Sequence, residues 1–307
     1  MSAPVSMVEA QLFSRLPEAL HYKGSPNAWV QMTRPGQRLH SFLEGPAFDR
    51  DGVLWLADVP YGRIFTVSPQ GEWTLALEYD GEPHGLAFDG SGDLLIADYR
   101  NGLLTWNGGP NPPETLVTKA DGAPLQGIAD LVVADDGTVW LTEPGRSSLS
   151  NPYGRLLKVD AGASEAVTVL ANLPYPNSVA LSPDGRLLYL SLTRSNTIWR
   201  LMTQGPETPP MAGVHIQLSG GLGPDGLAVH PRGLLAAAQA QAGRAYVFDS
   251  LGDKVAHIAT PGGTWTTAVR FSQDGRQLFI VEAQSGSIYS ADIASLLPQT
   301  DTTERPL

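Results

Sequence analysis

The sequence contains no cysteine among its 307 residues. The chain therefore has no disulfide framework, no thiolate metal site and no cysteine nucleophile. It also has no apolar run long enough to span a bilayer. Residues 1–11 lack the basic segment followed by an apolar segment that marks a signal peptide. We therefore expect a cytoplasmic protein with no membrane partner.

Several motifs of known active sites are missing as well. No Gly-x-Ser-x-Gly turn is present, so the sequence gives no support for a serine triad. A phosphate loop and a dinucleotide fingerprint are also missing. Basic residues are scarce, because 20 Lys and Arg face 31 Asp and Glu, which gives a formal net charge of −11. This balance argues against a nucleic-acid partner or an anionic membrane surface.

Glycine and proline are plentiful, with 33 and 25 residues, and a repeated phrase accounts for them. Each copy has a short apolar strand, a turn that is often Asp-Gly, and a second apolar strand. The turn glycines are Gly52, Gly92, Gly137, Gly185, Gly233 and Gly275, at spacings of 40 to 48 residues. This period is typical of propeller blades. The sequence predicts an all-β, six-bladed β-propeller with four-stranded blades, forming a single domain over residues 1–307.

The ends of the chain bear on how this propeller closes. In the first unit we expect strands at residues 47–48, 53–57, 63–67 and 74–78, whereas the last unit shows only three evident strands. Residues 1–41 contain two short apolar pieces, 12–16 and 28–32. Because an unpaired blade edge is a liability, we expect one of them to complete the sixth blade as its outer strand. Residues 298–307 are polar, and we expect a frayed tail.

One position in each repeat is a candidate for chemistry. The residue eight before each turn glycine begins the strand nearest the propeller axis, and in order these residues are Glu44, His84, Ala129, Asn177, Asp225 and Thr267. We call these six positions the ring. A buried core ring would be apolar, since buried polar groups need partners. Carboxylate and amide oxygens favour Ca²⁺, Mg²⁺ or Mn²⁺, although Zn²⁺ can occupy such a site. The alternative is that each side chain only hydrogen-bonds the backbone of a neighbouring blade.

Three stretches around the ring resemble the regucalcin/gluconolactonase (SMP-30/gluconolactonase/LRE-like) family. They are Glu44-Gly45-Pro46, residues 176–185 and Pro224-Asp225-Gly226, and the resemblance extends from Glu44 to Ile293. The resemblance implies a six-bladed propeller that hydrolyses sugar lactones and related lactones with one divalent metal ion, Ca²⁺ being the first choice. It implies that Glu44, Asn177 and Asp225 are the metal ligands. It also implies that Asp225 activates the attacking water.

The chain departs from that family at the third blade. Many members have Pro-Asn-Asp there, whereas this chain has Ile128-Ala129-Asp130. Ala129 removes a hydrogen-bonding group from the ring, which favours a less polar lactone or ester over a sugar lactone. Asp130 is retained, but its phase points it into the blade, where we expect a structural role.

Other residues are candidates for binding the substrate. His84 is a candidate acid, base or substrate donor, because imidazole titrates near neutrality, and the alternative is a hydrogen bond to the adjacent blade. Glu143 and Arg146 lie in a long insertion, residues 143–155, that we expect at the rim of the channel. Tyr175 and Trp265 flank ring strands, where aromatic residues as often serve in packing. Asp58, Asp98 and Glu143 share one phase, which also predicts hydrogen bonds to backbone N–H groups in blade turns.

The sequence therefore favours a metal-dependent lactone hydrolase with a small-molecule lactone as its substrate. In this hypothesis Asp225 or His84 accepts the proton of the attacking water. Two rivals stay open. One is a propeller enzyme that resembles strictosidine synthase, which would not need the metal ligands. The other is a non-catalytic propeller that binds a metal ion or a small molecule. The oligomeric state is open.

Overall fold

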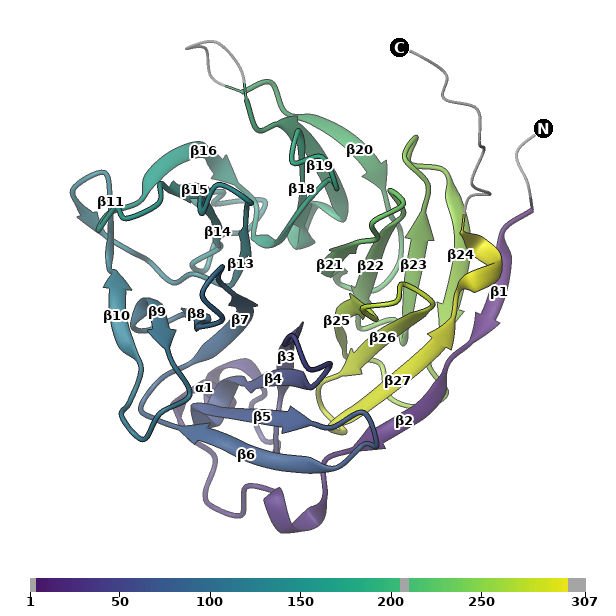
Figure 1. Cartoon of the computed structure of the whole chain (residues 1–307), viewed down its shortest axis with the longest axis horizontal. Helices are drawn as coiled ribbons and strands as arrows, with labels where there is room; N and C mark the ends of the chain where they lie inside the picture. The colour runs from purple at the N-terminus through teal and green to yellow at the C-terminus, as the bar shows by residue number, and fades with distance from the viewer. Residues whose placement is uncertain (1–3, 205–209, 298–307) are drawn as a thin grey trace.

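A computed structural model describes residues 4–204 and 210–297 of the chain. Six antiparallel sheets radiate around a central axis, each sheet being one blade of a β-propeller (Figure 1). The predicted all-β, six-bladed architecture is therefore confirmed. Helix α1 (Ala28–Thr33) and the four short 3₁₀ turns are too short to cross a membrane, and no other helix lies in the described residues.

The first three blades are built from strands that follow one another in the chain. From the axis outward, the first has β3 (Leu43–Phe48), β4 (Leu54–Asp58), β5 (Arg63–Val67) and β6 (Trp73–Glu78). The second has β7 (Pro83–Phe88), β8 (Leu94–Asp98), β9 (Gly102–Trp106) and β10 (Glu114–Val117). The third has β13 (Asp130–Val133), β14 (Val139–Glu143), β15 (Gly154–Val159) and β16 (Val167–Leu173). A small hairpin of β11 (Lys119–Ala120) and β12 (Ala123–Pro124) lies between the second and third blades in the sequence.

The remaining blades repeat this order. The fourth has β17 (Pro176–Leu181), β18 (Leu187–Leu192), β19 (Thr197–Met202) and β20 (Gly213–Gln217). The fifth has β21 (Gly223–Val229), β22 (Leu235–Ala240), β23 (Arg244–Phe248) and β24 (Lys254–Ala259). The sixth has β25 (Thr266–Phe271), β26 (Gln277–Glu282) and β27 (Ser287–Asp292). The 3₁₀ turns cover Glu18–Leu20, Val59–Tyr61, Thr193–Ser195 and Ala294–Leu296.

An N-terminal strand closes the ring of blades, as the sequence predicts. Strand β2 (Gln11–Arg15) pairs antiparallel with β27 and is the outer strand of the sixth blade. The first of the two apolar pieces therefore makes the closure, and the second forms α1 instead. Strand β1 (Ser6–Glu9) was not predicted, and it adds a fifth strand to the fifth blade, parallel to β24. The expected frayed tail lies outside the described residues.

The inner strands approach one another so closely that glycine is required beside the ring. Gly45 has a φ of 58°, and a Cβ there would lie 2.1 Å from the backbone oxygen of His84 in the next blade. A Cβ on Gly226 would lie 2.7 Å from the Cα of Ala268. No side chain fits at either position. Glycine after Glu44 and after Asp225 therefore allows neighbouring blades to approach closely at the axis.

The hydrophobic core is divided among the interfaces between adjacent blades. At the closure, Leu56 and Phe65 of the first blade pack with Val281 and Ile288 of the sixth, and all four side chains are fully buried. Burial of such side chains stabilises the fold by roughly 1.5–3 kcal/mol each. The blade-to-blade packing thus fixes the angle at which each inner strand presents its ring residue to the axis.

Candidate functional site

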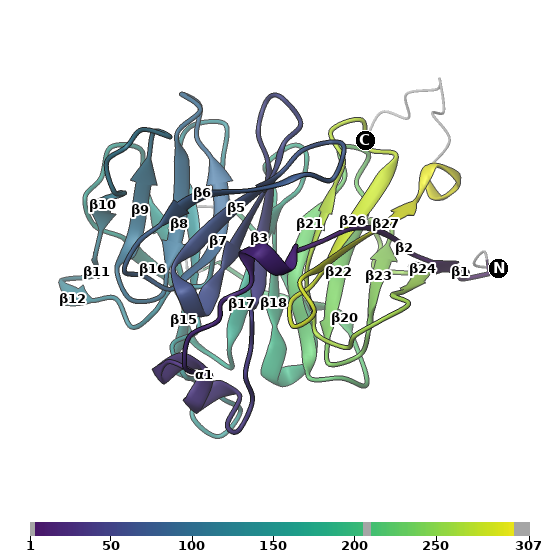
Figure 2. The ribbon, with the colours of Figure 1, turned by 90° about the horizontal axis from the view of Figure 1, so that it is seen from below.

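A cavity of about 480 Å³ opens at one end of the propeller axis. Its lining includes five of the six ring residues, namely Glu44, His84, Ala129, Asn177 and Asp225. Trp29 and Met32 of α1 form part of the wall. Figure 2 shows α1 beyond the ends of the blades, on the side where the N-terminal segment leaves the sheets. The repeat phase thus brings together five side chains that are spread over 182 residues of sequence.

The sixth ring residue serves the fold. Thr267 is buried, and its hydroxyl donates a hydrogen bond of 2.8 Å to the backbone oxygen of Leu43 in the first blade. It does not line the 480 Å³ cavity, but it lines a second cavity of about 390 Å³ in the channel, together with the other five. Thr267 therefore hydrogen-bonds the backbone of the neighbouring blade, as the alternative interpretation of the ring predicts.

A repeated carboxylate holds the backbone just before the ring. Asp58 Oδ1 accepts a hydrogen bond of 2.7 Å from the Phe42 N–H, two residues before Glu44. The same arrangement recurs in three other blades, where the pairs are Asp98 with the Glu82 N–H, Glu143 with the Gln126 N–H and Glu282 with the Trp265 N–H. The predicted role of Asp58, Asp98 and Glu143 in blade turns is confirmed by these bonds. Each fixes a segment that leads into a ring position.

Glu44 and His84 form a pair across the first two blades. His84 Nδ1 lies 2.7 Å from Glu44 Oε2, and both side chains are largely buried. Burial lowers the pKa of His84, but the Glu44 carboxylate and its hydrogen bond outweigh this and raise the pKa above its ordinary value. The Glu44 contact engages Nδ1, so Nε2 is the ring nitrogen left for a substrate.

Asn177 and Asp225 form a second pair, across the fourth and fifth blades. Asn177 Nδ2 donates hydrogen bonds to Asp225 Oδ1 at 2.7 Å and to Thr193 Oγ1 at 3.1 Å. Asp225 is only 9% exposed. Burial, and then the nearby carboxylate of Glu44, raise the pKa of Asp225 well above its ordinary value. The site therefore places two carboxylates in one poorly solvated space, where they repel each other.

This donor set fits a divalent cation. A positive ion would neutralise the Glu44 and Asp225 carboxylates, whose repulsion His84, Asn177 and Arg34 offset only in part. Both Nδ2 hydrogens of Asn177 are engaged, so the amide oxygen is left as a third oxygen donor. No group of three or more His, Asp or Glu that would hold a metal occurs among residues 4–204 and 210–297, so a cation at this site would need the Asn177 amide as a further donor.

The long insertion of the third blade shapes the cavity wall. Residues 144–148 line the cavity, Arg146 among them. Ser147 Oγ accepts a hydrogen bond of 2.9 Å from the Tyr175 N–H, and Tyr175 has a φ of 64°. A tyrosine in this left-handed region costs about 1–3 kcal/mol, so the surrounding bonds must hold it there. The insertion therefore helps to hold Tyr175 where it lines the cavity.

The other predicted substrate-binding residues divide into two groups. Ala129, Arg146, Tyr175 and Trp265 line the cavity together with His84. Glu143 does not line it, because its side chain is buried in the third blade and binds Arg155 and the Gln126 N–H. The structure therefore places Glu143 in a structural role, with no contact to this cavity. Its phase, shared with Asp58 and Asp98, had already indicated the structural role.

Sequence reasoning missed several residues of the wall. Trp29, Met32, Arg34 and Phe42 come from the N-terminal segment, and Arg194 follows β18. The N-terminal segment precedes the first repeat, so no repeat phase places its side chains relative to the axis.

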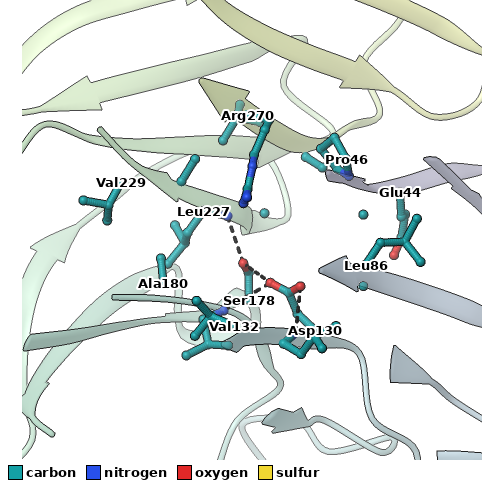
Figure 3. Close-up of a pocket in the computed structure, with 18 of the residues that line it drawn as sticks. Glu44, Pro46, Leu86, Asp130, Val132, Ser178, Ala180, Leu227, Val229 and Arg270 are labelled. Atoms are coloured by element: carbon teal, nitrogen blue, oxygen red, sulfur yellow. Dashed lines mark hydrogen bonds between the residues drawn. The ribbon is translucent and has the colours of Figure 1, made fainter. Parts of the chain in front are cut away.

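A second cavity, of about 390 Å³, occupies the other end of the channel and is shown in Figure 3. Ser178 Oγ donates a hydrogen bond to Asp130 Oδ2, and the Leu227 N–H donates to Ser178 Oγ at 2.9 Å. These bonds tie the inner strands of three consecutive blades together. Burial raises the pKa of Asp130 to about 6. Arg270 extends into the same cavity from β25 (Figure 3).

These features define a six-bladed propeller with an acid- and amide-lined cavity at one end of its axis. The sequence model of the SMP-30/gluconolactonase/LRE-like region matches residues 42–284, and the chain belongs to this family. The resemblance found in the sequence is thereby confirmed.

Individual relatives agree with this assignment. A curated relative, lactonase drp35 of Staphylococcus aureus, is 25% identical over 277 residues, which cover 85% of this chain and 84% of that protein. A gluconolactonase structure from Xanthomonas campestris is 25% identical and superposes with a TM-score of 0.72, covering 82% of this chain and 86% of that one. A calcium-binding protein, regucalcin, from Agrobacterium tumefaciens is 21% identical with a TM-score of 0.70, covering 83% and 90%, and it supports the fold.

Proposed function

We propose that this chain is a metal-dependent lactone hydrolase. The observation that carries the proposal is the pair of buried carboxylates, Glu44 and Asp225, beside the Asn177 amide oxygen at the end of the channel. Relatives that cover most of the chain are named lactonase and gluconolactonase, which supports the lactone as substrate.

Glu44, Asn177 and Asp225 would hold the metal ion. Three oxygen donors favour Ca²⁺ first, with Mg²⁺, Mn²⁺ and Zn²⁺ as further options. A structural relative is described as a calcium-binding protein, which agrees with that order. When bound, such a cation would polarise the lactone carbonyl and stabilise the negative charge that develops on its oxygen.

The chain's own residues supply the proton transfers. Asp225 Oδ1 accepts the Asn177 hydrogen bond, so Oδ2 is the oxygen available to take a proton from the attacking water. The water oxygen bonds to the carbonyl carbon, the bond from that carbon to the ring oxygen breaks, and the proton passes to the departing oxygen. The product is a hydroxy acid. His84, held at Nδ1 by Glu44, positions the substrate through Nε2.

A panel of lactones tests this function. Acid release would be followed with the protein as purified, after chelation, and after addition of Ca²⁺, Mg²⁺, Mn²⁺ or Zn²⁺. We expect at least one lactone to be hydrolysed, with loss on chelation and recovery with Ca²⁺. Metal-independent turnover would favour the strictosidine-synthase-like class. Ca²⁺ binding without turnover of any lactone would favour a non-catalytic module.

A further inference from the structure

Arg34 enters the cavity from outside the propeller repeats. It directly follows α1, and its N–H donates a hydrogen bond of 2.8 Å to the Val30 backbone oxygen. Val30 is fully buried. Asn27 caps the start of α1 by accepting a hydrogen bond of 3.1 Å from the Val30 N–H, and its amide also donates to the Pro60 oxygen. The helix is thus attached by the Asn27–Pro60 hydrogen bond and by the packing of Val30 with Phe42, which fixes the place of Arg34.

The guanidinium of Arg34 lies over two aromatic rings of the cavity wall. Its Cζ is 3.6 Å from the centroid of the Trp265 ring and 4.8 Å from that of Phe42. The backbone N–H of Trp265 in turn donates a hydrogen bond of 3.0 Å to the Glu282 carboxylate. A guanidinium stacked on an aromatic face has a fixed plane, and its N–H groups then point along that plane. The stacking presents Arg34 as an oriented hydrogen-bond donor.

Most of the donor capacity of Arg34 is unused. Nη1 donates to the Thr33 oxygen at 2.8 Å, whereas Nε is buried and has no hydrogen-bond partner among the described residues. Arg34 also forms no ion pair in this part of the chain. Because Nε is out of reach of solvent, the donors left for a ligand in the cavity are those of Nη2 and the second hydrogen of Nη1.

The same cavity holds two more arginines in a similar state. Arg146 and Arg194 line it, both are exposed, and neither forms an ion pair within the described ranges. Arg194 Cζ lies 5.2 Å from the centroid of the Tyr175 ring. Three guanidinium groups on one cavity are unexpected in a chain whose formal net charge is −11. The same cavity holds the carboxylates of Glu44, Glu82 and Asp225, so the arginines balance this negative charge and allow an anion to approach.

We propose that the cavity selects lactones that carry a carboxylate besides the lactone group, and that Arg34 binds this carboxylate through its guanidinium fork. The proposal rests on the proposed function, which uses Glu44, Asn177 and Asp225 for the lactone group and leaves Arg34 for the rest of the substrate. Arginine is the side chain whose planar donors match a carboxylate bidentately. Ala129, which offers no hydrogen bond to a sugar hydroxyl, is consistent with recognition by charge at another wall.

Binding in chelator-treated protein tests this without hydrolysis. The probes are a γ-butyrolactone bearing a ring carboxylate and the corresponding carboxamide, which has the same shape but no charge and one acceptor oxygen fewer, with quenching of tryptophan fluorescence as readout. We expect the carboxylate to bind about tenfold tighter or more, because charge-assisted hydrogen bonds are the strong ones. Arg34→Gln should abolish this preference, and Arg34→Lys should retain only part of it because the fork is lost.

The matched control is Arg186→Gln, which removes an arginine that is 72% exposed and does not line the cavity. It should keep the full preference for the carboxylate, and melting curves should show all variants folded. Equal affinity for the two probes in the unsubstituted protein would overturn the proposal. A preference that survives in Arg34→Gln would do so too, as would a preference confined to the ring-opened hydroxy acid. Preferential binding of the lactone carboxylate by a protein that hydrolyses no lactone would support this assignment and contradict the proposed function.

Discussion

The side-chain amide of Asn177 donates a hydrogen bond of 2.7 Å to the carboxylate of Asp225, across the junction of the fourth and fifth blades. Because Thr193 takes the other amide hydrogen, the orientation of Asn177 is set before any cation or substrate arrives. The two residues are 48 positions apart, one repeat of the propeller. The geometry of the candidate site is therefore a direct product of how one blade packs against the next.

Removal of the Asp58 carboxylate should be strongly destabilising. Asp58 is fully buried, accepts a hydrogen bond from the Phe42 N–H and pairs with Arg63, which is 7% exposed. Asp58→Ala leaves a buried guanidinium without its partner, so we expect a loss of about 3–5 kcal/mol in the free energy of unfolding. Denaturant unfolding measures it.

The control for this variant is the exposed pair of Asp80 and Arg100, whose side chains are 88% and 45% exposed. Asp80→Ala should leave the free energy of unfolding almost unchanged, because water already solvates both charges. Similar losses for the two variants would show that the buried pair does not anchor the segment before Glu44.

Asp130 should give the stability a specific pH dependence. Burial, as the largest influence, raises the pKa of Asp130 from 3.8 to about 6, against the lowering effect of hydrogen bonds from Ser178 and backbone N–H groups. Between these values the folded protein holds the proton more tightly than the unfolded chain. The contribution of Asp130 to stability is therefore present below pH 3.8 and is lost as pH rises through about 6.

Asp130→Asn should remove this component, which is on the order of 3 kcal/mol for a pKa raised from 3.8 to about 6. Unfolding measured at intervals between these pH values would reveal it as a smaller decline for the variant than for the unsubstituted protein. The exposed Asp51→Asn variant serves as the control and should follow the unsubstituted curve. Parallel curves for the Asp130 variant would contradict the prediction.

His84 should matter for binding more than for turnover. If Asp225 is the base and His84 positions the substrate, His84→Asn should raise KM and leave kcat within a few-fold. General-base catalysis contributes typically 10²–10⁴-fold, so a loss of kcat in that range, with cation affinity intact, would make His84 the base instead. Steady-state kinetics together with Ca²⁺ titration distinguishes the two outcomes.

Ala129 should control which lactones enter. It is 7% exposed and lines both cavities. Ala129→Asn narrows the cavity and adds a hydrogen-bonding amide, so we expect kcat/KM to fall for the preferred lactone and to rise for a sugar lactone such as gluconolactone. Unchanged kinetics on both lactones would place the residue outside the substrate's reach.

The contrast between Glu44 and Arg34 shows what the sequence predicts and what it does not. The sequence predicted that Glu44, His84 and Asn177 lie together, because a repeat of fixed phase puts equivalent residues at equivalent places around the axis. The same logic predicted six blades and a closing N-terminal strand. Arg34 precedes the first repeat, and its place depends on how α1 packs against the first blade.

Glu143 and β1 show two further limits. The position of Glu143 in the repeat predicted backbone hydrogen bonds, whereas its place in the long insertion suggested substrate contact. The structure shows bonds to Arg155 and to the Gln126 N–H. Strand β1 pairs with an edge of the fifth blade that was already complete with four strands. Whether such an edge strand forms depends on its tertiary contacts, which the local sequence pattern does not encode.

The most direct test of the account is the Ca²⁺ dependence of lactone hydrolysis in Glu44→Gln compared with the unsubstituted protein. The substitution removes one charge from the donor set and keeps the shape, so the half-saturating Ca²⁺ concentration should rise on the order of tenfold or more. Glu82→Gln, which removes a carboxylate from the same cavity but outside the ring, should leave the Ca²⁺ curve unchanged. A Glu44→Gln curve that coincides with the unsubstituted one, or activity that persists after chelation, would contradict a cation held by Glu44, Asn177 and Asp225.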